Sequence, residues 1–123
     1  MEHALVSVVE DDQFFRDSMR RLMRSLGYSV EVFSSAVDFL ASPHLLETAC
    51  LISDVQMPAM GGFELYQNLI STGRTIPTIL ITAYPNDADR DRALHDGVVC
   101  YLSKPVDETQ LKRCLHEILA TDE

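Results

Sequence analysis

Short apolar runs alternate with amphipathic stretches along the whole sequence, and this alternation restricts the fold more than any other feature. The apolar runs, such as ALVSVV at 4–9 and PTILIT at 77–82, are too short for helices and contain several β-branched residues. The stretch 12–26 instead carries apolar residues at helical spacing, and Gly27 follows it as a stop. This apolar stripe, which is expected to pack in the core, consists of Phe15, Met19, Leu22 and Leu26. The regular alternation predicts an α/β domain with a parallel sheet covered by helices on both faces.

The same patterns predict where each element lies. Strands are expected at 4–9, 28–33, 50–53, 77–82 and 98–103, and helices at 12–26, 35–46, 62–72, 86–95 and from Asp107 onward. Five strands and five helices in 123 residues favour the flavodoxin-like strand order 2-1-3-4-5 over the Rossmann order. We therefore expect residues 1–123 to form one domain, with no output domain in the chain.

Charge and composition exclude several classes of protein. The net charge of −9 argues against this domain binding nucleic acid by itself. No apolar run approaches the roughly 18 residues that a membrane span needs. The start, MEHALVSVVED, carries acid where a secretory signal would carry basic residues, so a cytoplasmic location is expected.

Three cysteines, Cys50, Cys100 and Cys114, are widely spaced along the chain. None belongs to a C-x-x-C pair, and their spacing matches neither a metal site nor a redox motif. Cys50 and Cys100 also lie in apolar runs, where free cysteine acts as a small buried hydrophobe. We therefore expect all three to be packing residues.

Polar side chains stand at the ends of four predicted strands. They are Glu10, Asp11 and Asp12 after the first strand, Asp54 after the third, Thr82 at the end of the fourth, and Lys104 after the fifth. Ligands in open α/β sheets bind outside the carboxyl ends of the strands, and the first and third strands are neighbours in the expected order. One such residue alone is usually a turn former, but four strand ends that converge indicate a site.

The chemistry of this edge indicates phosphoryl transfer. Carboxylates this close repel one another unless a cation lies between them, and an all-oxygen donor set suits Mg²⁺. With Glu10, Asp11 and Asp54 ionised, Mg²⁺ and Lys104 bring the formal charge to zero. A carboxylate in such a site can act as a nucleophile and form an aspartyl phosphate.

Four motifs carry a resemblance to a known family. VVEDD, ISDVQMPAMGG, LITAY and YLSKP, in this order and at these separations, resemble the receiver domains of two-component response regulators, with FixJ-type receivers the nearest likeness. The likeness covers essentially the whole chain and implies the CheY-like version of the flavodoxin-like fold. It also implies that Asp54 accepts a phosphoryl group from a histidine of a sensor kinase, and that the domain is not a conventional enzyme.

The resemblance assigns the remaining roles residue by residue. Asp11 would bind Mg²⁺ directly, Glu10 through water and Gln56 through its backbone carbonyl, with Asp54 completing the set and Mn²⁺ as a substitute ion. Lys104 would pair with the phosphoryl oxygens, and Thr82 would donate its hydroxyl to them. Tyr101 would turn inward as Thr82 moves, which makes these two the switch residues.

Smaller features follow from the residues and the family together. Asp12 is expected to cap the first helix rather than to bind the metal. Lys104-Pro105 resembles a cis peptide of the family. Gln56 and Tyr84 stand two residues beyond Asp54 and Thr82 and are expected to tune hydrolysis of the phosphate.

The expected output is a two-state switch of the face formed by the helix at 86–95, the strand at 98–103 and the helix that begins at Asp107. This face would bind an output domain, or a second receiver in a homodimer formed on phosphorylation.

The kinase would dock near the helix at 12–26, where Phe14 lies outside the apolar stripe and is a candidate contact together with Arg16. The FixJ-type likeness suggests control of transcription through a DNA-binding segment outside these residues. The alternative is a stand-alone receiver that acts by protein–protein contact or as a phosphorelay intermediate.

Three rival functions fit the residues less well. A haloacid-dehalogenase phosphatase needs D-x-D after its first strand, whereas Val55-Gln56 follow Asp54. A flavodoxin-like FMN carrier needs a Ser/Thr/Gly-rich phosphate loop where this chain has acids. A receiver fold that serves only as a scaffold would not need the intact set of acids, Thr82 and Lys104.

Overall fold

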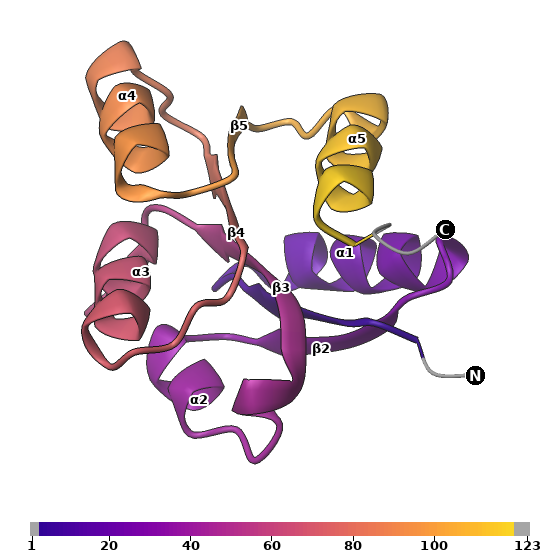
Figure 1. Cartoon of the computed structure of the whole chain (residues 1–123). Coiled ribbons are helices and arrows are strands. Elements are labelled where there is room, and N and C mark those ends of the chain that lie inside the picture. The colour runs from indigo at the N-terminus through magenta and orange to yellow at the C-terminus, as the bar shows by residue number, and fades with distance from the viewer. Residues whose placement is uncertain (1–2, 120–123) are drawn as a thin grey trace.

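The computed structural model describes residues 3–119 and contains a five-stranded sheet between two layers of helices (Figure 1). The strands are β1 (Leu5–Val9), β2 (Ser29–Phe33), β3 (Thr48–Asp54), β4 (Thr78–Thr82) and β5 (Cys100–Ser103). They are all parallel and lie in the order β2-β1-β3-β4-β5, which confirms the predicted topology. Nearly every residue of β3 and β4 is buried, because both strands lie inside the sheet and helices cover both faces.

The helices are α1 (Gln13–Ser25), α2 (Ala36–Leu40), α3 (Gly62–Ser71), α4 (Asp87–Asp96) and α5 (Glu108–Leu119). Figure 1 shows α1 and α5 on one face of the sheet and α2, α3 and α4 on the other. A core on the first face joins β1, β3 and β4 to Met19 of α1 and to Leu111 and Leu115 of α5. Met23 is fully buried in this core, although the predicted apolar stripe of α1 omitted it.

Side-chain caps fix where the helices begin. Asp12 accepts a hydrogen bond from the Phe14 backbone N–H at 3.0 Å, so its predicted capping role in α1 is confirmed. Ser35 and Asn86 cap α2 and α4 in the same way, each by accepting from the backbone N–H three residues on. Asp107 accepts from two backbone N–H groups at the start of α5.

The prediction of one helix over 35–46 is wrong. α2 ends at Leu40, and a separate 3₁₀ turn, η1, spans Leu45–Glu47. Pro43 lies between them, and proline both lacks a backbone N–H and disfavours helical conformation in the residue before it. The third strand is longer than predicted and begins at Thr48, whose hydroxyl hydrogen-bonds that of Ser7 in β1 at 2.9 Å.

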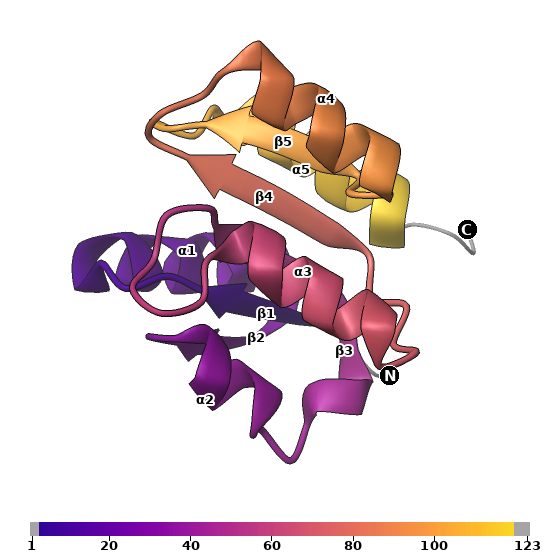
Figure 2. The ribbon, with the colours of Figure 1, turned by 90° about the vertical axis from the view of Figure 1, so that its left-hand side faces the viewer.

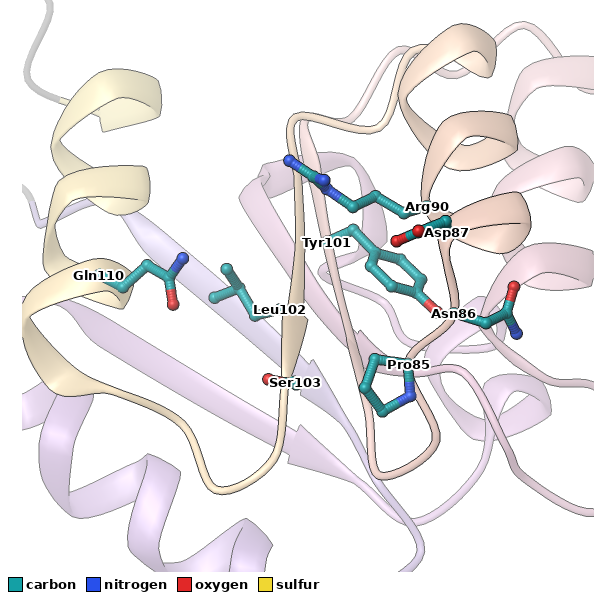
Figure 3. A pocket seen from close by; sticks show the side chains of 8 residues that line it. All are labelled: Pro85, Asn86, Asp87, Arg90, Tyr101, Leu102, Ser103 and Gln110. Carbon is teal, nitrogen blue, oxygen red and sulfur yellow. The ribbon is translucent and has the colours of Figure 1, made fainter.

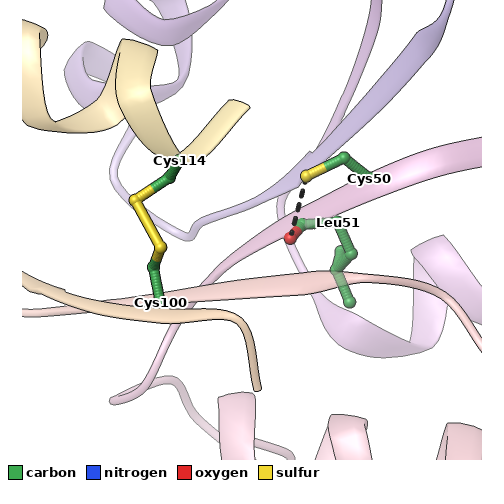
Figure 4. The surroundings of a disulfide bond; sticks show 4 residues. All are labelled: Cys50, Leu51, Cys100 and Cys114. Carbon is green, nitrogen blue, oxygen red and sulfur yellow. Dashed lines mark hydrogen bonds between the residues drawn. A yellow bond between two sulfur atoms is a disulfide. The ribbon is translucent and has the colours of Figure 1, made fainter. Parts of the chain in front are cut away.

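The expectation that all three cysteines serve only as packing residues is also corrected. Cys100 of β5 and Cys114 of α5 form a disulfide, whereas Cys50 of β3 is buried and free (Figure 4). The two partners are 14 residues apart in sequence and match no motif. Only the packing of α5 against β5 brings them together.

All five strands run in the same direction, so their carboxyl ends share one edge of the sheet. Figure 2 shows the arrowheads of β1, β4 and β5 pointing to this edge, where the loop from β3 to α3 also lies. Among residues 3–119, no helix combines the length and the apolar character that crossing a membrane requires.

Candidate functional site

Three carboxylates meet at this edge, as the sequence predicts. Oxygen atoms of Glu10, Asp11 and Asp54 lie within 4.8 Å of one another. β1 and β3 are hydrogen-bonded neighbours, and this pairing brings the residues that end the two strands together. Glu10 is 1% exposed and Asp54 7%, whereas Asp11 is exposed to solvent. The site is therefore an acidic cluster with one accessible member and two buried ones.

Lys104 supplies the positive charge. Its Nζ donates to Glu10 Oε1 at 2.8 Å and to Asp54 Oδ2 at 3.4 Å. The same ammonium lies over the ring of Phe15, 4.5 Å from its centroid, and this cation–π contact helps to hold the long side chain in place. The predicted cis peptide between Lys104 and Pro105 is present. Sequence reasoning missed the contact with Phe15, which it assigned only to core packing.

Burial dominates the electrostatics of the cluster. It raises the pKa of Glu10 from 4.5 to about 7, although hydrogen bonds from Lys104 and from the Asp12 backbone N–H act to lower it. Burial acts to lower the pKa of Lys104, but its hydrogen bonds and charge interactions with Glu10 and Asp54 outweigh burial and raise that pKa. One lysine thus compensates only part of the charge of three acids, and the cluster favours a further cation.

The donor set fits a hard divalent cation. Every side-chain ligand atom of the cluster is a carboxylate oxygen, and no histidine or cysteine belongs to the cluster. Mg²⁺ in proteins binds one or two carboxylates and keeps several waters, which the exposed Asp11 can accommodate. The residues therefore fit the ion that the sequence predicts.

Thr82 lies beside the cluster, where its hydroxyl already has two partners. Thr82 Oγ1 donates to Gln56 Oε1 at 2.8 Å and accepts from the Tyr84 backbone N–H at 2.9 Å. The Gln56 backbone N–H in turn approaches Asp54 Oδ1 at 3.4 Å. Sequence reasoning placed Gln56 here but missed its side-chain bond, because the partners are 26 residues apart. This bond holds Thr82 in the present conformation.

A glycine shapes the loop that follows Asp54. The Gly62 backbone N–H donates to the Val55 carbonyl at 3.1 Å and brings the start of α3 against the end of β3. A Cβ atom at Gly62 would lie 2.7 Å from the Asp54 carbonyl oxygen, closer than such contacts occur. The close approach of the two backbones is the physical reason for a glycine at this position.

Tyr101 lies beside a pocket on the face formed by α4, β5 and α5. Its side chain packs against the apolar cluster of α3 and α4, and among residues 3–119 its buried hydroxyl makes no regular hydrogen bond and has only a weak contact with the Asn86 backbone. Figure 3 shows the ring between β5 and α4, with the hydroxyl directed toward Asn86. The adjoining pocket of about 310 Å³ is also lined by Arg90, Ser103 and Gln110. The ring can therefore change position without breaking a regular hydrogen bond.

The two residues expected to contact a kinase differ in their surroundings. The Phe14 side chain is 85% exposed next to the acidic cluster, a degree of exposure that packing does not explain. Arg16 is half-buried, and its Nη1 donates to the Glu10 backbone carbonyl at 2.8 Å. Arg16 therefore has a structural role within the domain, tying α1 to the end of β1.

Comparison with known proteins shows which family the chain belongs to. Residues 6–116 match the family model described as "Response regulator receiver domain". The chain belongs to this family. A receiver domain is thus the module of two-component signalling that the acidic cluster, Thr82 and Lys104 indicated, and the predicted family is confirmed.

Similar proteins share the sequence and the fold. The receiver is 38% identical over 91% of its length to a Leptolyngbya boryana protein described as "Uncharacterized 14.6 kDa protein in sodA1 3'region", covering 87% of that protein. It is 31% identical over 86% of its length to the transcriptional regulatory protein FixJ of Bradyrhizobium diazoefficiens. The crystal structure of FixJ-N has a TM-score of 0.85 at 29% identity and covers 98% of this receiver and 97% of that chain. The likeness to FixJ-type receivers is confirmed.

The length of the match differs among these relatives. The receiver spans 52% of FixJ and about half of the response regulator proteins TmoT and TodT, which it also matches. What those longer proteins do as a whole is therefore separate from what the receiver does.

Proposed function

We propose that this receiver accepts a phosphoryl group on Asp54 from a phosphohistidine of a sensor kinase, in a reaction that depends on Mg²⁺. The observation that carries the proposal is the position of Asp54, whose carboxylate lies in a cluster with two other acids and 3.4 Å from Lys104. In the reaction a carboxylate oxygen of Asp54 attacks phosphorus, the P–N bond breaks, and the histidine nitrogen leaves with the bonding electron pair.

The residues around Asp54 position and stabilise the phosphoryl group. Lys104 can turn its ammonium from Glu10 and Asp54 to the phosphoryl oxygens, since it already lies within hydrogen-bond distance of both acids. Glu10, Asp11, Asp54 and the Gln56 carbonyl would hold Mg²⁺, or Mn²⁺ in its place. When bound, the ion would offset the negative charge that the acids and the phosphoryl group share.

The phosphoryl group gives Thr82 a new hydrogen-bond acceptor. Thr82 would leave Gln56, 2.8 Å away in this structure, and donate to a phosphoryl oxygen. Tyr101 would move into the space that Thr82 vacates, and the pocket between α4, β5 and α5 would change shape. A change of about 1–3 kcal/mol in the free-energy difference between the two conformations is enough to shift their populations.

The changed face would then contact a partner. We propose that the α4–β5–α5 face binds an output domain or a second receiver, and that the regulator is cytoplasmic. The FixJ relative is a transcriptional regulatory protein about twice as long as the part that matches, which supports control of transcription as the output. We propose that the receiver catalyses no reaction other than the phosphorylation of Asp54 and the hydrolysis of that phosphate. Reading the gene beyond Glu123 tests the proposed output segment.

One experiment tests the phosphorylation. The wild type is incubated with acetyl phosphate and Mg²⁺, and the intact mass is measured. We expect one phosphoryl group on the wild type, none on Asp54→Asn, and none on the wild type in excess chelator. Asp38→Asn, which changes an exposed acid of α2, is the matched control and should be labelled like the wild type. Equal labelling of Asp54→Asn and the wild type would refute the proposal.

A further inference from the structure

The disulfide between Cys100 and Cys114 connects two elements of the proposed output face. Cys100 is the first residue of β5, and Cys114 lies in the middle of α5 (Figure 4). Their Cα atoms are 6.6 Å apart, within the range of roughly 4.4–6.8 Å that disulfides span. Neither backbone has to move far for the sulfurs to bond or to separate.

The closed loop contains residues that the phosphorylation switch uses. Tyr101 directly follows Cys100, and Lys104 and Pro105 lie between β5 and α5. Lys104 also contacts Glu10 and Asp54, so one short covalent ring includes the switch tyrosine and the lysine of the site. Oxidation of this pair therefore constrains the segment that joins the phosphorylation site to the output face.

We propose that Cys100 and Cys114 form a reversible redox pair which, when oxidised, fastens α5 to β5 and restrains the α4–β5–α5 face. The domain does not need the bond for its core, because the first apolar cluster already packs α5 against the sheet through Leu111 and Leu115. In the cytoplasm thiols are kept reduced, and disulfides that form there are mostly transient and redox-sensing. The reversibility argued from a cytoplasmic location and the consequence for signalling both rest on the proposed function, whereas the pairing of Cys100 with Cys114 does not.

The chemistry is thiol–disulfide exchange with a low-molecular-weight disulfide such as oxidised glutathione. Cys100 is half-buried and Cys114 only 6% exposed, so the Cys100 thiolate attacks first and releases one glutathione thiolate. The Cys114 thiolate then attacks the Cys100 sulfur, which forms the protein disulfide and releases the second glutathione thiolate. Two electrons pass to glutathione, and the two protein thiols lose their protons.

Cys50 provides an internal control. It is 0% exposed in β3, and burial raises the pKa of its thiol to about 12. The buried thiol should therefore neither attack glutathione disulfide nor exchange with the pair.

The first test counts free thiols across glutathione buffers of increasing oxidised fraction. Thiols are alkylated after rapid unfolding in acid, and the intact mass gives the number of labels. We expect the wild type to pass from three labels to one, Cys50→Ala from two labels to none, and Cys114→Ser to form no intramolecular disulfide. The proposal is overturned if the pair stays reduced at the highest oxidised fraction, or stays oxidised in excess reduced glutathione.

The second test asks whether the bond restrains the face. Amide hydrogen exchange is measured for α5 and for residues 104–107 in both redox states. We expect exchange at least about tenfold slower in the oxidised wild type, because a ring of this size removes open conformations. Cys100→Ser in oxidising buffer should match the reduced wild type. Equal exchange in both states would overturn the restraint. Asp54→Asn should show the same difference in exchange between the oxidised and reduced states, although it cannot be phosphorylated at position 54. A failure of the proposed phosphorylation is therefore distinguished from a failure of the redox pair.

Discussion

Removing the charge of Glu10 should make the metal-free domain lose less stability as the pH rises. Glu10 is 1% exposed, and its burial raises the pKa of the carboxyl from 4.5 to about 7 in the folded protein. The folded state thus holds this proton more tightly than the unfolded chain. The free energy of unfolding therefore falls as pH rises through the window between these two values, and stays lower above it.

The structure gives the size of this effect. Each tenfold change in an ionisation constant corresponds to about 1.4 kcal/mol, so the rise in pKa of Glu10 corresponds to roughly 3 kcal/mol. Glu10→Gln keeps the shape of the side chain and one acceptor oxygen for the Asp12 backbone N–H, but it loses the second oxygen, which accepts from Lys104, and it cannot ionise. Between about pH 5 and pH 8 in chelator, the wild type should lose roughly 2–3 kcal/mol more stability than Glu10→Gln.

Urea unfolding in chelator at several pH values measures this difference. Mg²⁺ should restore more stability to the wild type than to Glu10→Gln at pH 8, because the variant has lost one carboxylate of the cluster. Asp12→Asn, beside the cluster but exposed, is the control and should keep the wild-type pH dependence. Parallel stability curves for wild type and Glu10→Gln would show that burial does not raise this pKa.

Three further variants test individual contacts. Lys104→Met removes the cation that lies 2.8 Å from Glu10 and 3.4 Å from Asp54. We therefore expect phosphorylation by acetyl phosphate to be at least about tenfold slower, but Mg²⁺ to bind more tightly. Weaker Mg²⁺ binding, measured by calorimetry, would contradict this. Gln56→Ala removes the acceptor of the hydrogen bond from the Thr82 hydroxyl, and such a bond contributes about 1 kcal/mol. The variant should therefore raise the phosphorylated fraction at steady state up to about fivefold. An unchanged fraction would show that Gln56 does not restrain Thr82. Gly62→Ala places a Cβ atom against the Asp54 carbonyl oxygen and should lower the free energy of unfolding, measured in urea, by about 1–3 kcal/mol. A variant as stable as the wild type would show that the loop changes conformation to accommodate the methyl group.

The features predicted from sequence are those that short-range patterns encode. Strand order followed from the alternation of elements, and the convergence of Glu10 and Asp54 followed from the position of each at a strand end. The Asp12 cap followed from its place before an amphipathic stretch. Such features depend on a few consecutive residues and on a general rule of parallel sheets, so one sequence suffices to infer them.

The features that escaped prediction depend on side chains brought together from distant segments. The bond between Thr82 and Gln56 requires the turn after β3 to reach β4, and the disulfide of Cys100 with Cys114 requires the packing of α5. No spacing rule encodes either pair. The early end of α2 is different, since Pro43 was visible in the sequence and signals that break.

The position of the phosphoryl group on the chain is the measurement that decides the proposed function. The wild type is phosphorylated by a histidine kinase domain with Mg²⁺ and reduced with borohydride, which converts an aspartyl phosphate to homoserine, and the peptides are sequenced by mass spectrometry. We expect homoserine at position 54 and at no other acid, and we expect it to be absent when Mg²⁺ is chelated. Homoserine at position 11 or 12, or an equal yield without Mg²⁺, would contradict the proposed function.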